Sequence, residues 1–305
     1  MSNHPDDYIK AELMACCGAR EIKDGDIVIV GTGFPAMSAN IARYTHAPGA
    51  MLMQESGVFD ARPTRPALSV GDPCLNPGAA MTGGLVDVIG MFLQGGWVDV
   101  GFLAGSQIDK YGNINTTVIG KYENPKSRLP GSGGANPIGS LAKRGLIIAL
   151  HNIRTLTEKV DFITTPGYLE GPGARERWGL PPDTGPQVII TNKAVMRFDK
   201  QTKEAYLESY HPGTTVAEVV KLTPWKLKVS DDVFETEPPR EEEIRVMREV
   251  IDPHRMIQIY EKRGMYSRAQ RRGMCPLPGM REQDSRSPEY KETYGLHKTA
   301  CTVLL

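Results

Sequence analysis

Cysteine is scarce in this sequence, which has five cysteines among 305 residues. The five are irregularly spaced and no two form a C-x-x-C motif, which argues against a disulfide framework and against a structural zinc site. The six histidines are scattered without the spacing of metal ligands, so no metal is implied. We therefore expect a protein of the reducing cytoplasm, in which Cys16 and Cys17 lie on the buried face of a helix.

Long hydrophobic runs and an excess of charge of one sign are also lacking. No stretch approaches the ~18 consecutive apolar residues that a membrane-spanning helix needs, and the first residues lack the basic-then-apolar pattern of a signal peptide. Lys and Arg together number 36, as do Asp and Glu, so the formal net charge is zero. A general nucleic-acid binder normally has a basic excess, so we expect neither nucleic acid nor membrane as a partner.

Glycine and proline are abundant, with 32 and 23 residues, and they separate short apolar runs from helical segments. The apolar runs predict strands at 26–30, 51–55, 98–104, 146–150 and 162–165, and a small β-meander near 187–210. Helices are predicted at 6–22, 36–44, 214–222 and 240–251. Strands interleaved with helices indicate an α/β fold with an open, largely parallel sheet flanked by helices.

The apolar periodicity fades after about residue 258. We therefore expect one domain over 1–258 and a polar, basic C-terminal tail over 259–305. Few aliphatic residues occur in the tail, which is typical of a poorly ordered segment. A basic arm for RNA or membrane binding is the alternative, which we disfavour because acidic residues are interspersed among its arginines.

The first candidate site is the glycine-rich turn from Gly31 to Ala36, which formally matches G-x-G-x-x-A between a strand and a helix. Such a turn can bind the pyrophosphate of a dinucleotide. Pro35, however, removes a backbone N–H where the pyrophosphate would need a donor. We favour a tight strand-to-helix turn over a dinucleotide site.

Glu55 is the second candidate, because it ends a predicted buried strand and open α/β sheets bind ligands at the carboxyl ends of their strands. Two structural alternatives remain open from the residues alone. The carboxylate could cap a helix, or it could pair with Arg62 or Arg65.

Two further segments could contact a ligand. The loop from Gly131 to Asn136 has three glycines, whose exposed N–H groups could bind phosphate or a developing oxyanion. A flexible connector is the alternative interpretation. Arg175 and Arg177 could bind a carboxylate or a CoA phosphate, but we favour structural ion pairs for both.

Four motifs together carry a family resemblance. They are Met53–Gly57, Gly105–Asn113, Gly131–Asn136 and Gly171–Arg177. In this order and spacing, they resemble the beta subunit of glutaconate CoA-transferase, a family I CoA-transferase, from about residue 8 to about residue 258.

The resemblance implies an open α/β fold, an alpha-type partner in a hetero-oligomer, and a site between the two halves. It implies that Glu55 is the nucleophile and that CoA is a substrate rather than a permanently bound cofactor. It also places oxyanion or thioester binding at Gly133, Gly134 and Ala135. We assign substrate or CoA binding to Ser56, Gln107 and Asn136.

The chemistry implied is transfer of CoA between an acyl-CoA and a free acid through a glutamyl-CoA thioester. The Glu-Ser-Gly setting of Glu55 resembles the dicarboxylate branch, whereas 3-oxoacid transferases resemble Glu-Asn-Gly. Two alternatives are a CoA-ester hydrolase or decarboxylase on the same scaffold, and a non-catalytic dinucleotide-binding subunit.

Overall fold

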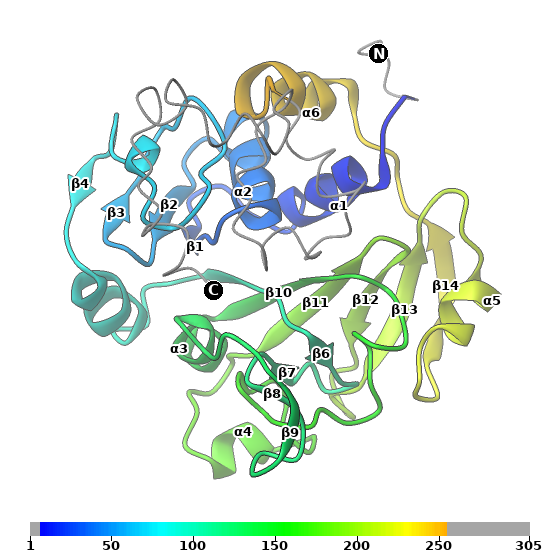
Figure 1. The fold of residues 1–305 in the computed structure, drawn as a ribbon. Helices are drawn as coiled ribbons and strands as arrows, with labels where there is room; N and C mark the ends of the chain where they lie inside the picture. Colours follow the sequence, from blue (N-terminus) through cyan, green and yellow to red (C-terminus); the bar gives the residue numbers. More distant parts are fainter. Residues whose placement is uncertain (1–6, 255–305) are drawn as a thin grey trace, which may run out of the picture.

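A computed structural model describes residues 7–254, so the expected tail over 259–305 lies outside the described residues. Its centre is a ten-stranded sheet in the order β14-β13-β12-β11-β10-β5-β1-β2-β3-β4 (Figure 1). The strands are β1 (Ile27–Ile29), β2 (Met51–Gln54), β3 (Val58–Phe59), β4 (Met81–Thr82), β5 (Val100–Leu103), β10 (Arg144–Ala149), β11 (Pro186–Thr191), β12 (Ala194–Phe198), β13 (Ala205–Tyr210) and β14 (Lys228–Glu235).

Five adjacent strands, β11-β10-β5-β1-β2, run parallel, which confirms the predicted open and largely parallel sheet. β12 and β13 continue from β11 in antiparallel fashion, so the predicted meander is present and extends the main sheet. Two small sheets lie outside it. They are formed by β6 (Gln107–Ile108) with β7 (Ile114–Asn115), and by β8 (Val118–Gly120) with β9 (Pro125–Arg128).

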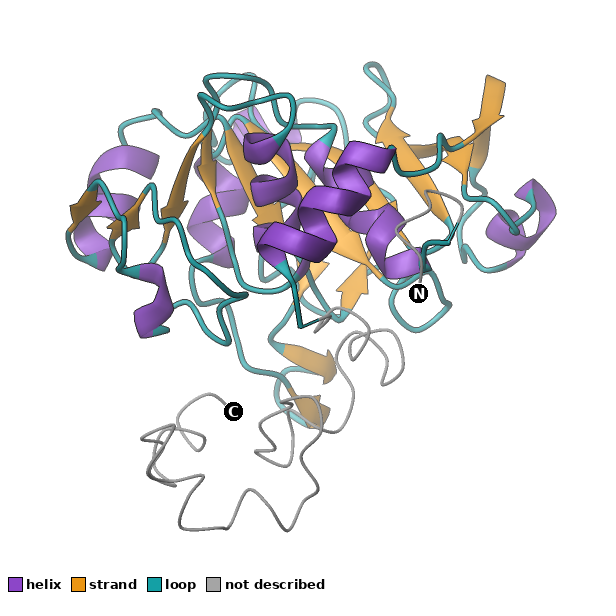
Figure 2. Cartoon of the chain, turned by 90° about the horizontal axis from the view of Figure 1, so that it is seen from above, coloured by secondary structure: helices purple, strands orange, loops and turns teal. Residues whose placement is uncertain are grey.

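Helices cover both faces of the sheet (Figures 1 and 2). Those on one face are α1 (Lys10–Ala19), α2 (Phe34–Tyr44), α6 (Glu241–Val246) and the π-helix η3 (Met247–Ile251). The opposite face carries the π-helix η2 (Val86–Leu93) and α3 (Ala135–Leu141). The remaining helices are η1 (Pro73–Leu75), α4 (Ala174–Arg177) and α5 (Val216–Lys221).

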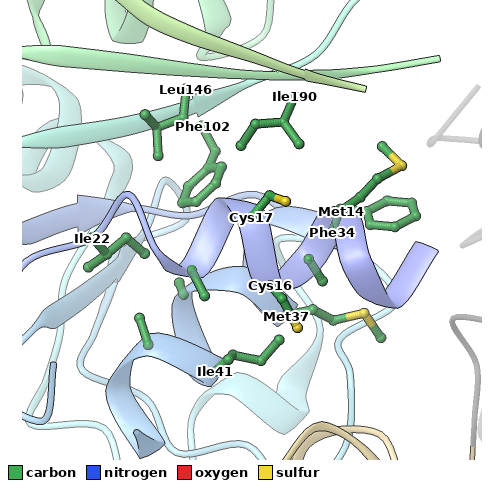
Figure 3. Close-up of a cluster of buried hydrophobic side chains, with 14 of the residues drawn as sticks. Met14, Cys16, Cys17, Ile22, Phe34, Met37, Ile41, Phe102, Leu146 and Ile190 are labelled. Atoms are coloured by element: carbon green, nitrogen blue, oxygen red, sulfur yellow. The ribbon is translucent and has the colours of Figure 1, made fainter. Parts of the chain in front are cut away.

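The sheet separates two hydrophobic cores because successive strand residues point to opposite faces. Val28 and Val30 belong to the core under α1 and α2, whereas Ile29 belongs to the core under η2 and α3. Cys16 and Cys17 lie in the first core, at 0% and 6% exposure (Figure 3). The predicted buried helix face is therefore confirmed, and burial raises the pKa of the Cys17 thiol to about 12.

The strand predicted at 162–165 is wrong. This segment is irregular and forms only an isolated bridge between Thr165 and Ile114. The hydroxyl of Thr164 contacts that of Thr117 at 2.7 Å and accepts from the N–H of Thr116 at 2.9 Å. Threonine hydroxyls that bond to nearby backbone groups offer an alternative to a regular ladder.

The order of the strands reverses at β1, at the carboxyl edge of the parallel strands. From β1 the chain proceeds to β2 on one side, and later places β5 on the other side of β1. When the connections that follow two neighbouring strands go to opposite sides of the sheet, their loops move apart at the carboxyl ends of the strands. The gap between the loops leaves room for a ligand. The segments following β1, β2 and β5 therefore converge at this edge.

Candidate active site

Glu55 is the first residue of the three-residue loop that joins β2 to β3. The loop closes with the N–H of Gly57 donating to the carbonyl of Gln54 at 3.0 Å. Gly57 has a φ of 105°, a conformation that strongly favours glycine and is typical of the last residue in such hairpin loops. A carboxylate is thus held on a tight turn at the carboxyl edge of the sheet.

The carboxylate of Glu55 is half-buried and makes no hydrogen bond or ion pair with any residue in 7–254. Arg65 instead binds both carboxylate oxygens of Asp72 at 2.9 Å, and Arg62 lies 3.6 Å from Asp60. The structural alternatives for Glu55, an arginine pair or a helix cap, are therefore wrong within this part of the chain.

The glycine loop before α3 lies directly against Glu55. A Cβ at Gly134 would lie 2.1 Å from Oε2 of Glu55, so only glycine leaves room for the carboxylate where it is. The close packing of α3 on β5 brings the loop there, because a Cβ at Gly101 would lie 2.3 Å from Cγ2 of Ile138. Two segments that are distant in sequence, both selected from the sequence, thus meet at one point.

The backbone N–H groups of this loop differ in whether they already have a hydrogen-bond partner. The N–H groups of Gly133 and Gly134 have no hydrogen-bond partner among the described residues. The N–H of Ala135 donates to the carbonyl of Ser132 at 3.0 Å. Asn136 likewise holds the loop, since its N–H donates to the Ser132 hydroxyl at 3.1 Å and its side chain to the Thr164 carbonyl at 2.8 Å.

Ser56 and Gln107, both selected for substrate or CoA binding, lie in contrasting surroundings. The Ser56 hydroxyl is buried and has no hydrogen-bond partner within the described part of the chain. Oε1 of the nearby Gln54 is also buried without a partner there. The amide of Gln107 is engaged with protein groups: it accepts from Asn115 at 2.7 Å and donates to Asp161 at 3.0 Å. Gln107 thereby links β6, β7 and the segment containing Asp161.

Arg175 and Arg177 both make structural contacts, but among the described residues only Arg177 forms the ion pair favoured from the sequence. The guanidinium of Arg175 is buried and donates to four backbone carbonyls, of Gly139, Ser140, Pro166 and Gly167, and to the Thr184 hydroxyl. These contacts join the last turn of α3 to the Pro166–Gly167 segment. Arg177 forms an exposed ion pair with Glu170 at 3.0 Å.

The turn from Gly31 to Ala36 lies beside Glu55, because the N–H of Val30 donates to the carbonyl of Met53 at 2.9 Å. Gly33 has a φ of 75° and directly precedes α2, and the N–H of Met37 donates to its carbonyl at 3.0 Å. This geometry is the tight strand-to-helix turn that the sequence favours.

Three residues around Glu55 were not selected from the sequence. Gly83 and Gly84 pack on Gly57, and Asp87 binds the N–H of Gly84 at 2.6 Å. The Gly-Gly doublet followed by an aspartate was the available signal, but its contact with Gly57 is not visible in the sequence. Within 7–254, no group of three or more metal-ligating side chains is present, and no helix is long and apolar enough to cross a membrane.

Comparison with known proteins identifies a family. A family model described as coenzyme A transferase matches residues 12–222. The chain is 40% identical over 253 residues to the beta subunit of glutaconate CoA-transferase of Acidaminococcus fermentans, covering 81% of this chain and 93% of that protein. It is 42% identical over 241 residues to the beta subunit of 3-oxoadipate CoA-transferase of Pseudomonas knackmussii, covering 79% and 92%.

A solved structure agrees with these sequence relatives. The crystal structure of glutaconate coenzyme A-transferase from Acidaminococcus fermentans superposes with a TM-score of 0.76 at 38% sequence identity. The match covers 81% of this chain and 96% of the matched chain.

Proposed function

The chain belongs to the coenzyme A transferase family as a beta-type subunit, and from this premise we propose that Glu55 is its nucleophile. CoA is then moved between an acyl-CoA and a free dicarboxylic acid through a glutamyl-CoA thioester. The observation that supports Glu55 is its unpaired carboxylate, held on a tight turn against the backbone of Gly134.

The first half of the reaction needs no general base, because a carboxylate is already a nucleophile. An oxygen of Glu55 attacks the thioester carbonyl, the C–S bond breaks, and CoA leaves as a thiolate. The product is a mixed anhydride between Glu55 and the acyl group. The thiolate then attacks the glutamyl carbonyl, the anhydride C–O bond breaks, and the acyl group leaves as a free carboxylate.

The second half repeats these steps in reverse with the acceptor acid. Its carboxylate attacks the glutamyl-CoA thioester, the thiolate leaves, and the thiolate then attacks the acceptor's carbonyl in the new anhydride. The acceptor is released as acyl-CoA and Glu55 is restored. Anhydrides hydrolyse readily, so water must be excluded during both halves.

We assign the oxyanion donors to Gly133 and Gly134, whose N–H groups are unpaired among the described residues. The N–H of Ala135 is already used by Ser132, so Ala135 is left with the role of holding the loop. A single donor of this kind stabilises a tetrahedral intermediate by about 3–4 kcal/mol in other enzymes. The unpaired Ser56 hydroxyl is the side-chain donor we propose for substrate. Asn136 and Gln107 can add only the amide N–H that they do not already donate to Thr164 and Asp161.

We further propose an alpha-type partner that contacts this chain at the η2 patch, defined by Leu85, Val86 and Met91. These apolar side chains are 57%, 71% and 61% exposed, and they lie on and beside η2, the helix that follows the Gly83–Gly84 segment packed on Gly57. Exposed apolar clusters of this kind mark interaction sites. The two sequence relatives are likewise single subunits of larger enzymes.

The dicarboxylate preference rests on the Glu-Ser-Gly setting and on those relatives, since glutaconate and 3-oxoadipate each carry two carboxylates. We place the catalytic domain at 1–258 and the enzyme in the cytoplasm. The test is CoA exchange by the chain co-purified with its partner, using glutaconate, 3-oxoadipate or acetate as acceptor. Transfer that depends on a dicarboxylate supports the proposal, whereas release of CoA without any acceptor identifies a hydrolase.

A further inference from the structure

Asp87 lies outside the catalytic loop, yet its carboxylate contacts the backbone on which that loop rests. Its Oδ2 accepts the N–H of Gly84 at 2.6 Å, and the N–H of Asp87 donates back to the carbonyl of Gly84 at 3.0 Å. The same Oδ2 occupies the space beside Gly83, where a Cβ would lie 2.5 Å from it. Asp87 therefore fixes the Gly83–Gly84 peptide from one side.

The other side of this peptide lies against Gly57. A Cβ at Gly57 would lie 2.3 Å from the carbonyl oxygen of Gly83 and 2.7 Å from the nitrogen of Gly84. The N–H of Gly83 donates to the carbonyl of Gly57 at 2.7 Å. Because the N–H of Gly57 in turn closes the loop on Gln54, the chain of contacts runs from Asp87 to both ends of the Glu55 turn.

We propose that Asp87 is a positioning residue for the nucleophile, acting through the Gly83–Gly84 peptide and Gly57 on the orientation of Glu55. The inference rests on the proposed role of Glu55. A nucleophile displaced by about 1 Å can lose about a hundredfold in rate even when the substrate still binds, because the reacting atoms are no longer aligned. A shift of the Gly83–Gly84 peptide would displace the turn with it, because the N–H of Gly83 is bonded to the carbonyl of Gly57.

The chain contains a matched control for this interaction. Asp24 accepts the N–H of Gly49 at 2.6 Å, and a Cβ at Gly49 would lie 2.9 Å from its Oδ1. The bond and the packing are thus of the same kind as those of Asp87. Asp24 and Gly49 precede β1 and β2, so they lie at the amino edge of the sheet, away from Glu55.

The experiment measures how fast the assembled enzyme forms the covalent CoA adduct as acyl-CoA concentration rises, without an acceptor. For Asp87→Ala we expect a maximal rate at least about tenfold lower than in the wild type, with a half-saturating concentration within about twofold. Asp24→Ala should match the wild type. Asp87→Asn keeps an oxygen that can accept the Gly84 N–H, so it should recover most of the rate.

A second pair of variants tests the same contact without removing Asp87. Gly83→Ala places a methyl group 2.5 Å from Oδ2 and should reproduce the slow rate. Gly84→Ala places one at 3.7 Å, an ordinary contact, and should retain most of the wild-type rate. If Asp87→Ala does not assemble with the partner, the comparison of these two variants decides the question.

Four results would overturn the inference. A normal maximal rate in both Asp87→Ala and Gly83→Ala would do so, as would an Asp87→Asn variant as slow as Asp87→Ala. If Asp87→Ala raised only the half-saturating concentration of acyl-CoA and left the maximal rate unchanged, Asp87 would act in acyl-CoA binding instead. If the wild type forms no adduct, the proposed function of Glu55 fails and this inference fails with it. That failure shows in the wild-type enzyme alone, whereas failure of the inference about Asp87 shows only when the variants are compared with a wild type that does form the adduct.

Discussion

The carboxylate of Glu55 faces the backbone of Gly134, so closely that a Cβ at Gly134 would lie 2.1 Å from Oε2. The nearest atom of any other side chain, Cδ1 of Ile138, would be at an ordinary 3.5 Å. Gly134 has a φ of −75°, which any residue can adopt. A methyl group at this position therefore conflicts with the nucleophile and with little else.

Gly134→Ala should consequently separate activity from stability. The flexible Glu55 side chain can move away from the methyl group, so the melting temperature should change by only a few degrees. CoA exchange should fall by about tenfold or more, because the carboxylate leaves its position. Gly71→Ala is the control, since a Cβ there meets nothing within 4 Å and its φ is ordinary. Normal exchange in Gly134→Ala would contradict the geometry proposed for the site.

Arg175 and Arg177 should behave oppositely on substitution. Arg175→Ala leaves several buried carbonyls without a donor, so we expect a loss of about 3 kcal/mol or more in the free energy of unfolding. Arg177→Ala removes an exposed ion pair and should leave stability unchanged. Urea denaturation measures both. A stable Arg175→Ala variant with a raised KM for acyl-CoA would instead support anion binding at Arg175.

Two buried histidines should make the protein sensitive to mild acid. Burial lowers the pKa of His151 and of His211 to about 4. Both are neutral in the folded state, whereas in the unfolded chain they gain protons below about pH 6.5. Their contribution to the free energy of unfolding is therefore fully present above about pH 6.5, and it is lost as the pH falls towards 4.

At pH 5 the loss amounts to about 2 kcal/mol for each histidine relative to pH 7.5. Urea midpoints measured at pH 7.5, 6.0 and 5.0 should fall accordingly. In His211→Asn, the decrease between pH 7.5 and 5.0 should be about half as large. An equal decrease in this variant and the wild type would show that His211 is not responsible.

The η2 patch should govern assembly with the alpha-type partner. Val86→Lys places a charge where we propose apolar contact, so it should weaken complex formation by about tenfold or more, measured by titration of the two purified subunits. Val220→Lys is the control, because Val220 is a half-exposed valine on α5, at the opposite end of the sheet (Figure 1). Equal affinities for both variants would place the interface elsewhere.

Much of the sheet could be predicted because its central strands are short, mostly apolar runs. Ile27–Ile29 and Arg144–Ala149 are buried on both faces, and such runs are recognisable from composition. β14 was not predicted, because Lys228–Glu235 is polar, largely exposed and lies at the edge of the sheet. η2 was also missed, since Val86–Leu93 combines β-branched residues and a glycine with a helical conformation.

The candidate site could be predicted only in part. Glu55 and the Gly131–Asn136 loop are visible as local motifs, but their contact depends on α3 packing against β5. The engagement of Gln107 with Asn115 and Asp161, and of Ala135 with Ser132, also depends on the folded chain. In the sequence, Asp87 is only an aspartate that follows a Gly-Gly doublet, and its link to Glu55 passes through three glycines whose packing no local pattern reveals.

The most direct test of Glu55 as the nucleophile is intact-mass analysis of the assembled enzyme incubated with acyl-CoA and no acceptor. We predict a gain of CoA less one water on this chain, mapped to the peptide containing Gln54, Glu55 and Ser56. Glu55→Gln should form no adduct, because a neutral amide is a poor nucleophile, while acyl-CoA binding persists because the shape is nearly unchanged. A wild-type enzyme that exchanges CoA at a normal rate without forming the adduct would contradict the assignment.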